Sequence, residues 1–297
     1  MTVRSPARFL RKYGSDYLSI LPFYALFSIF GVYPLIYSII ISLNKWNANK
    51  PWVFVGLKNY SDLLFKDTVF WTSLYNVVFL LLLNVPLMIV LSILIAVALN
   101  SSTQRFKDFF RIVYLLPYVA SVLSISVLFY VLFDDQMGTI NLLLKSINWP
   151  AVPWLSSPKL SKVAIDIVVT WKWIGYNMII ALAGLQSIST EIYDSVKIDG
   201  AGKPRIFFQI TLPLLRPVMG FQFIMATIGT LTMFSEPFIL TAGGPGYSSL
   251  TPVLYLYRTS FKFFALDRGA AIAVLTFFVV LIPSIFQIRL WAERDGQ

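Results

Sequence analysis

The chain of 297 residues contains no cysteine and no histidine. Disulfide bonds, thiol nucleophiles, Cys/His zinc sites and histidine general bases are therefore excluded. Charged residues are also scarce, at 13% of the chain, whereas an average soluble domain has about 25%. Hydrophobic residues reach 57% and the mean hydropathy is +0.73. This composition predicts an integral membrane protein and excludes an ordinary soluble domain.

Long apolar runs account for most of the hydrophobic residues. A membrane helix needs about 20 of them in succession. The first run is longer than the core of a signal peptide, which has about 7–15 residues, so we interpret it as a retained span. We predict an all-α membrane protein whose six transmembrane helices lie at 17–43, 72–99, 110–133, 162–185, 214–240 and 269–291.

The distribution of Lys and Arg predicts which side of the membrane each link occupies. Basic residues in the two tails and in the second and fourth links outweigh those in the other links, modestly by number and more clearly by density. Because cytoplasmic links are enriched in Lys and Arg, both termini are expected in the cytoplasm. The net charge of +10 has the same explanation, and no nucleic acid is expected as a partner. The predicted organisation is a tail at 1–16, a six-span domain at 17–291 and a tail at 292–297.

A polar segment at 191–217 separates the fourth and fifth apolar runs. It has about 27 residues, although helix–helix links usually have about 2–8. Gly200 can take the left-handed conformation that ends a helix. Pro204 suits the first turn of a second helix, and Pro213 is expected to end that helix. The first short helix, near 191–199, carries a mixed apolar and charged face that suits docking into a cleft of a soluble protein, while the alternative is an interfacial helix lying on lipid.

Spaced positions in this segment resemble the cytoplasmic loop of binding-protein-dependent ABC importer permeases. That family carries Glu-Ala-Ala, three residues, Gly, nine residues and Ile-x-Leu-Pro, and its carbohydrate branch adds Asp-Gly-Ala. The matching positions here are Asp199, Gly200, Ala201, Ile210, Leu212 and Pro213. The chain departs from the pattern at Asp194, Ser195 and Val196, which replace Glu-Ala-Ala.

A second stretch, at 241–246 with the Leu-Tyr-Leu-Tyr at 254–257, resembles the segment before the last span in sugar permeases. The resemblance covers essentially the whole chain. It is strongest to the larger permease of the maltose and glycerol-phosphate type, without the extra N-terminal spans of the maltose permease.

The resemblance implies the architecture of a type I ABC importer permease in the bacterial cytoplasmic membrane. Such a subunit is no enzyme: it moves a sugar, oligosaccharide or sugar acid by alternating access. The implied partners are a second permease, two ABC ATPase subunits, an external solute-binding protein, the carbohydrate and the lipid bilayer. The loop at 186–213 would couple to the ATPase through Tyr193, Asp194, Ser195, Val196, Asp199, Gly200, Leu212 and Pro213.

ATP binding by the chain itself is not expected. A Walker A loop needs G-x-x-x-x-G-K-[ST]. The nearest candidate, Gly202-Lys203, is followed by Pro204 and lacks the first glycine. We therefore expect no cofactor on this chain and place ATP and Mg on the partner ATPase.

Polar residues within the spans are the candidates for a substrate path. A Lys at a helix centre costs about 2.5–3.5 kcal/mol on insertion scales, so Lys172 must face a cavity or a partner. One interpretation is a structural ion pair with Glu236 or Asp166. The other is a sugar site on the fourth and fifth spans, formed by Lys172, Trp173, Tyr176, Asn177, Phe234 and Glu236. Asn76 and Asn84 are predicted to form interhelical hydrogen bonds, and neither a catalytic nor a metal site is expected.

Two other classes of protein remain open. A secondary, ion-coupled transporter for small polar solutes would need carboxylates within its spans, and Asp166 and Glu236 are both predicted to lie toward span ends. A membrane-embedded enzyme without His or Cys would need Ser/Lys or paired carboxylates.

Overall fold

A computed structural model describes residues 6–47, 50–100 and 104–292. The ends of the two predicted tails, 1–5 and 293–297, lie outside the described residues. The elements in chain order are α1 (Pro6–Phe27), the π-helical turn η1 (Ser28–Val32), α2 (Tyr33–Ser42), β1 (Asn44–Asn47), β2 (Lys50–Phe54), α3 (Lys58–Phe65), α4 (Thr68–Asn100), α5 (Gln104–Val119), α6 (Val122–Leu132), α7 (Thr139–Ser146), α8 (Leu160–Ser187), α9 (Thr190–Ile198), α10 (Lys203–Ile206), the π-helical turn η2 (Phe207–Thr211), α11 (Leu212–Leu214), α12 (Arg216–Leu231), α13 (Ser235–Leu240), α14 (Pro252–Tyr257), the π-helical turn η3 (Arg258–Lys262) and α15 (Leu266–Ala292).

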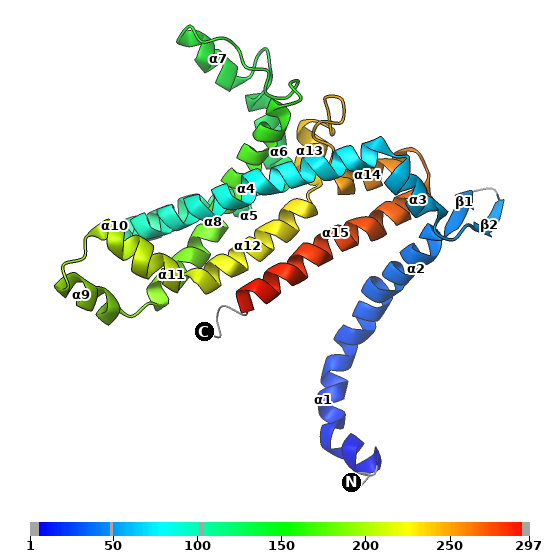
Figure 1. Ribbon diagram of the computed structural model, residues 1–297, viewed down its shortest axis with the longest axis horizontal. Helices are drawn as coiled ribbons and strands as arrows, with labels where there is room; N and C mark the ends of the chain where they lie inside the picture. The colour runs from blue at the N-terminus through cyan, green and yellow to red at the C-terminus, as the bar shows by residue number, and fades with distance from the viewer. Residues whose placement is uncertain (1–5, 48–49, 101–103, 293–297) are drawn as a thin grey trace.

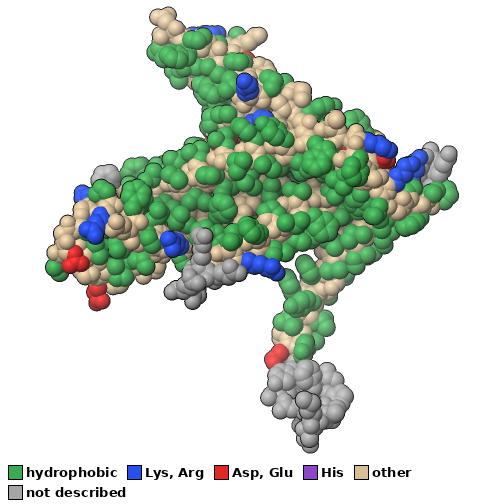
Figure 2. Space-filling model, viewed as in Figure 1, with side chains coloured by type: hydrophobic (Ala, Val, Ile, Leu, Met, Phe, Trp, Pro, Cys, Tyr) green, Lys and Arg blue, Asp and Glu red, His purple; other side chains and the backbone are tan. Residues whose placement is uncertain are grey.

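Membrane-spanning helices dominate the structure, as the sequence predicts. Within the described residues five helical segments are long and apolar enough to cross a membrane, or six if a bent pair counts as one span. Helices α4, α8, α12 and α15 run alongside one another, while α1 diverges from them (Figure 1). Hydrophobic side chains cover the middle of the face shown in Figure 2, and charged side chains gather nearer its two ends. This distribution is expected of a protein surrounded by lipid.

The third span is bent, whereas the sequence predicts one run at 110–133. Helices α5 and α6 meet at an angle of 94°. Ser121, between them, has an extended conformation with φ −58° and ψ 132°, and Pro117 removes a backbone donor from the last turn of α5. The apolar composition of the run gave no indication of this bend.

The fifth span is also interrupted, although the sequence predicts an unbroken run at 214–240. Helix α12 ends at Leu231 and α13 begins at Ser235. Breaks at membrane depth are tolerated where other groups bond the freed carbonyls. The buried hydroxyl of Thr251 donates to the carbonyl of Met233 over 2.8 Å. The break therefore has a specific structural support.

The bundle is tied together by polar groups as well as by apolar packing. The predicted interhelical hydrogen bonds of Asn76 and Asn84 are confirmed. Asn84 Nδ2 on α4 donates to Thr170 Oγ1 on α8 over 3.0 Å. Asn76 Oδ1 accepts from Lys162 Nζ on α8 over 3.2 Å. Asn76 Nδ2 also donates to the carbonyl of Leu250 over 3.0 Å, which fixes the loop before α14 to α4.

The end of the bundle opposite α9 carries a small hairpin, so the all-α prediction misses one feature. Strands β1 and β2 pair antiparallel, with Asn44 opposite Phe54 and a register irregularity between Lys45 and Asn47. The hairpin follows α2 directly and lies close to α3 (Figure 1).

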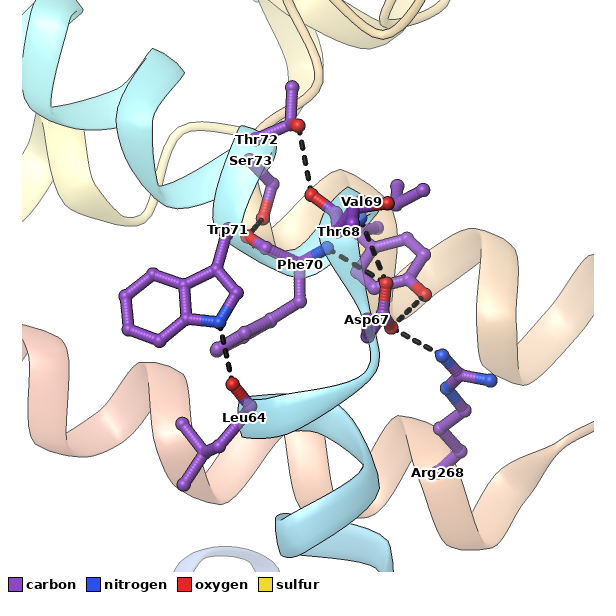
Figure 3. Close-up of polar contacts among 10 residues, drawn as sticks. Leu64, Asp67, Thr68, Val69, Phe70, Trp71, Thr72, Ser73 and Arg268 are labelled. Atoms are coloured by element: carbon purple, nitrogen blue, oxygen red, sulfur yellow. Dashed lines mark hydrogen bonds and ion pairs between the residues drawn. The ribbon is translucent and has the colours of Figure 1, made fainter.

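A buried carboxylate joins three elements near this hairpin (Figure 3). Asp67 precedes α4, and its Oδ1 accepts hydrogen bonds from the amides of Val69 and Phe70 at 2.9 and 3.1 Å. Its Oδ2 accepts from the Tyr255 hydroxyl at 2.6 Å and is ion-paired with Arg268. Burial acts to raise the pKa of Asp67, but the hydrogen bonds from Tyr255, Arg268 and the Phe70 amide outweigh it and hold the pKa below its ordinary value. Asp67 thus caps α4 and joins it to α14 and α15.

The Asp67→Asn variant is expected to unfold at a lower temperature than the wild type at pH 7. Hydrogen bonds to charged groups contribute about 1.5–3 kcal/mol each, and the amide keeps the shape without the charge. Because the folded-state pKa is depressed, this stabilisation is present above the ordinary pKa of about 4 and is lost as the pH falls through the folded-state value. The measurement is thermal unfolding of the detergent-solubilised wild type and variant at pH 7, 5 and 3.5. The difference between their unfolding temperatures should narrow only in the most acidic sample.

The matched control is Asp62→Asn, because the Asp62 side chain forms a solvent-exposed pair with Lys66. It should leave the unfolding temperature nearly unchanged. Equal unfolding temperatures for Asp67→Asn and the wild type at pH 7 would contradict the role assigned to Asp67.

Candidate functional site

A cavity of about 340 Å³ lies among α4, α8, α12 and α13. Both halves of the broken fifth span contribute to its wall, since Thr230 on α12 and Ser235 on α13 both line it. The structure brings all six predicted substrate-path residues to this one cavity: Lys172, Trp173, Tyr176, Asn177, Phe234 and Glu236. Glu236, expected toward a span end, reaches the cavity because the break starts a new helix at Ser235.

The predicted ion pair of Lys172 is absent from the described residues. Neither Glu236 nor Asp166 lies within 4.0 Å of its ammonium group. Lys172 Nζ instead lies 5.6 Å from the ring centre of Trp173, a distance at which a cation is attracted to an aromatic face. Asp166 is buried elsewhere on α8, and its Oδ1 has no hydrogen-bond partner in the described part of the chain.

An aromatic cluster stands beside the cavity. Tyr176 stacks on Tyr118 with ring centres 4.8 Å apart, and Trp173 meets Tyr118 edge-on at 5.3 Å. Tyr118 belongs to the last turn of α5, just before the bend, so sequence analysis missed it. The close approach of α5 to α8 depends on Gly175, because a Cβ there would lie 1.8 Å from the carbonyl oxygen of Tyr114.

The side-chain amide of Asn177, one of the predicted cavity residues, is held in place. Its Nδ2 donates to the carbonyl of Trp173 at 3.1 Å and approaches Met88 Sδ at 3.3 Å.

Several cavity residues on neighbouring helices were not predicted from the sequence as part of a site. Asn84 was predicted as a hydrogen-bonding residue but also lines the cavity. Further lining residues without a sequence signal are Met88, Val122, Val169, Met225, Ala226, Gly229, Thr230, Thr232, Met233 and Ser235.

The loop predicted to couple to a partner forms a separate surface at the end of the bundle (Figure 1). Helix α9 is capped by Ser189, whose Oγ accepts from the amide of Glu191 at 3.2 Å. Gly200 ends it with φ +74°, as predicted, and Pro204 lies in the first turn of α10. Two short helices with a glycine break are therefore confirmed.

The prediction that Pro213 ends the second helix is wrong. Helical backbone continues from α10 through η2 and α11 to Leu214 and resumes in α12 at Arg216. Pro213 is tolerated because it lies at the start of α11, directly after a π-helical turn, where its missing N–H breaks no regular ladder. The second short helix is thus an almost continuous extension of the fifth span.

Half of the eight predicted coupling residues are fully accessible. Asp194, Ser195, Asp199 and Gly200 are exposed, and Asp194 pairs with Lys197 over 2.9 Å.

The remaining coupling residues, Tyr193, Val196, Leu212 and Pro213, are half-buried. The Tyr193 hydroxyl lies 3.3 Å from Thr211 Oγ1, which links α9 to the helix that continues into the membrane. Apolar side chains are also presented outward, since Ile198 is 87% exposed. Among the described residues no cluster of three or more acidic side chains could hold a metal ion.

Two surfaces therefore define the molecule: a polar, aromatic cavity within a bundle of membrane helices, and an exposed helical loop at one end. Residues 69–294 match the family model described as binding-protein-dependent transport system inner membrane component. The chain belongs to this family, whose members are transport permease subunits.

Relatives of known assignment are permeases of sugar ABC transporters. The lactose transport system permease protein LacF of Rhizobium radiobacter is 36% identical, with 99% of each chain covered. The arabinooligosaccharides transport system permease protein AraP of Halalkalibacterium halodurans is 33% identical over 92% of this chain and 86% of that one. The multiple sugar-binding transport system permease protein MsmF of Streptococcus mutans is 32% identical over 98% of each.

A solved structure shares the fold. A chain in the crystal structure of a bacterial alginate ABC transporter, in complex with an alginate pentasaccharide-bound periplasmic protein, superposes with a TM-score of 0.84. The match covers 96% of both chains at 21% sequence identity. The architecture is thus that of an ABC transporter permease.

Proposed function

We propose that this chain is the membrane-spanning permease of an ATP-driven sugar importer and that sugar crosses the membrane through the cavity lined by Lys172 and Glu236. The observation that carries the proposal is the convergence of six polar and aromatic side chains from α8, α13 and the break before it on one cavity. Charged and amide groups are costly within a membrane unless they face a cavity or a partner. Tyr176 and Trp173 add flat apolar surfaces, and Asn177 an oriented amide.

The proposed mechanism is alternating access. ATP would close a pair of partner ATPase subunits, which would move α9 and, through the helix from α10 to α12, the cavity wall. The almost continuous helix and the Tyr193–Thr211 contact support such a transmission. This chain would bind no cofactor, because ATP and Mg would be held by the ATPase subunits.

The proposed partners are a second permease, two ABC ATPase subunits and an external binding protein that delivers the carbohydrate. Sugar permeases among the relatives, and an alginate transporter crystallised with a periplasmic protein, support this assembly. The proposed location is a bacterial cytoplasmic membrane, with both termini and α9 on the cytoplasmic side.

An ion-coupled transporter is the second candidate, and the buried carboxylate of Asp166 is the observation that favours it. The two functions differ in their energy source. Proteoliposomes containing the purified complex should take up sugar when ATP is enclosed with the ATPase subunits, and a collapsed proton or sodium gradient should not reduce the rate. Uptake that depends on the proton or sodium gradient and does not depend on ATP would establish the ion-coupled transporter instead.

The Lys172→Ala variant is expected to slow sugar uptake by about tenfold or more while basal ATP hydrolysis continues. A lost hydrogen bond from a charged group costs about 1.5–3 kcal/mol, and 1.4 kcal/mol corresponds to a factor of ten. Uptake and ATPase rates would be measured on the same proteoliposomes. Lys159→Ala, just before α8, is the control, and unchanged uptake by Lys172→Ala would remove Lys172 from the path.

A further inference from the structure

The cavity holds one positive and one negative side chain, and neither has a charged partner among the residues that the structure describes. Lys172 and Glu236 are the charged groups among its described lining residues. No described carboxylate lies within ion-pair distance of Lys172, and no described Lys or Arg lies within that distance of Glu236. The cavity therefore has no net charge, yet it keeps a free cationic donor and a free anionic acceptor.

The position of both charges in one small cavity has consequences for a ligand. A sugar acid would be attracted to Lys172 but would meet the carboxylate of Glu236 within the same 340 Å³. In a partly dehydrated site such repulsion is stronger than in water. A neutral sugar meets no such conflict, because each hydroxyl can accept from Lys172 or donate to Glu236.

We propose that this cavity selects neutral sugars and discriminates against sugar acids, with Glu236 as the residue that excludes a negative charge. Lys172 and Glu236 hydrogen-bond to hydroxyl groups on the same sugar, and Trp173 and Tyr176 contact its ring. The volume lies at the small end of the about 300–1,000 Å³ found for ligand pockets, so the cavity holds one short sugar at a time. This inference rests on the proposed function, which places the cavity on the sugar path.

Equilibrium binding of sugars to the purified importer complex in nanodiscs tests the inference. The external binding protein is left out of this assay, because it would impose its own selection. The probes are radiolabelled galactose and galacturonate, which differ by a carboxylate. The wild type is expected to bind galactose at least tenfold more tightly than galacturonate. In Glu236→Gln the affinity for galacturonate should rise about tenfold, while that for galactose changes by less than about threefold.

Two further variants separate charge from general disturbance. Lys172→Gln should weaken galacturonate binding further, because the carboxylate of Glu236 is then unopposed. Asp62→Asn also replaces a carboxylate by an amide, on α3 and outside the cavity, and should change neither affinity.

A wild type that prefers galacturonate overturns the inference, and so does a galactose-to-galacturonate ratio that Glu236→Gln leaves unchanged. Failure to bind either sugar also overturns it. In each of these cases ATP-driven uptake by the complete importer provides the separate test of the proposed function. Continued uptake leaves the permease assignment standing, while absence of uptake removes both.

Discussion

An Asp194→Lys variant is expected to remain in the membrane and to lose ATP-driven sugar uptake by about tenfold or more. Asp194 is exposed on α9, where its neighbour Lys197 is a surface partner, and exposed pairs of this kind contribute little to stability. Folding of the permease should therefore be preserved. We expect the docking cleft of the ATPase to present a basic group to Asp194. A Lys at this position would then place like charges together, which costs several kcal/mol, and each 1.4 kcal/mol is a factor of ten in affinity.

The measurement for Asp194→Lys is uptake and ATP hydrolysis in the same proteoliposomes, together with the amount of ATPase that co-purifies with the permease. The matched control is Asp62→Lys, which makes the same change on α3, where Asp62 also pairs with a nearby exposed Lys. The control should retain its ATPase. Full uptake and full ATPase retention in Asp194→Lys would contradict the docking role of α9.

A Gly175→Ala variant is expected to have the second large effect, on both stability and transport. The new Cβ would lie 1.8 Å from the carbonyl oxygen of Tyr114 and 2.4 Å from its carbonyl carbon. Since these are backbone atoms of α5, the clash is relieved only if α5 moves away from α8. That movement would lift Tyr118 from Trp173 and Tyr176 beside the cavity.

The expected loss for Gly175→Ala is about 1–3 kcal/mol or more, the usual range for overpacking, with a lower unfolding temperature and impaired uptake. Gly229→Ala is the control, because Gly229 also lines the cavity but its Cβ would meet nothing within 4 Å. Helical Gly→Ala changes generally favour the helix by about 0.5–1 kcal/mol. An unfolding temperature for Gly175→Ala as high as that of Gly229→Ala would show that the close approach of α5 and α8 is unimportant.

Hydrophobic runs were sufficient to predict the spans, since each run must cover the membrane thickness. They could not reveal the bend after Val119 or the break before Ser235, because neither interruption contains a charged residue, Gly or Pro that would divide the apolar run. The support for the break at Met233 comes from Thr251, which is distant in sequence. Such long-range compensation leaves no periodic pattern.

The cavity was partly predictable for a physical reason. Lys172 and Asn177 are polar residues within an apolar span, and a membrane makes that arrangement costly unless the side chains face polar space. Tyr118 and Met88 carry no such signal, because aromatic and apolar side chains can also face lipid without a free-energy cost of this kind. Pro213 was misinterpreted since a proline ends a regular α-helix, whereas here it follows a π-helical turn at the start of a new segment.

Cysteine labelling of the cavity gives the most direct test of the claim that sugar crosses through it under the control of ATP. The chain has no cysteine of its own, so Thr232→Cys places a single thiol on the exposed side chain at the cavity wall. The complete importer would be treated with a membrane-impermeant thiol reagent from either side, with and without a non-hydrolysable ATP analogue. Ser146→Cys, exposed on α7, would serve as the control.

Thr232→Cys is expected to react from the cytoplasmic side without nucleotide and from the external side with the analogue. Sugar should protect it, whereas Ser146→Cys should react only from the external side and equally with and without nucleotide or sugar. Labelling of Thr232→Cys that is independent of both nucleotide and sugar would contradict the ATP-controlled passage of sugar through the cavity.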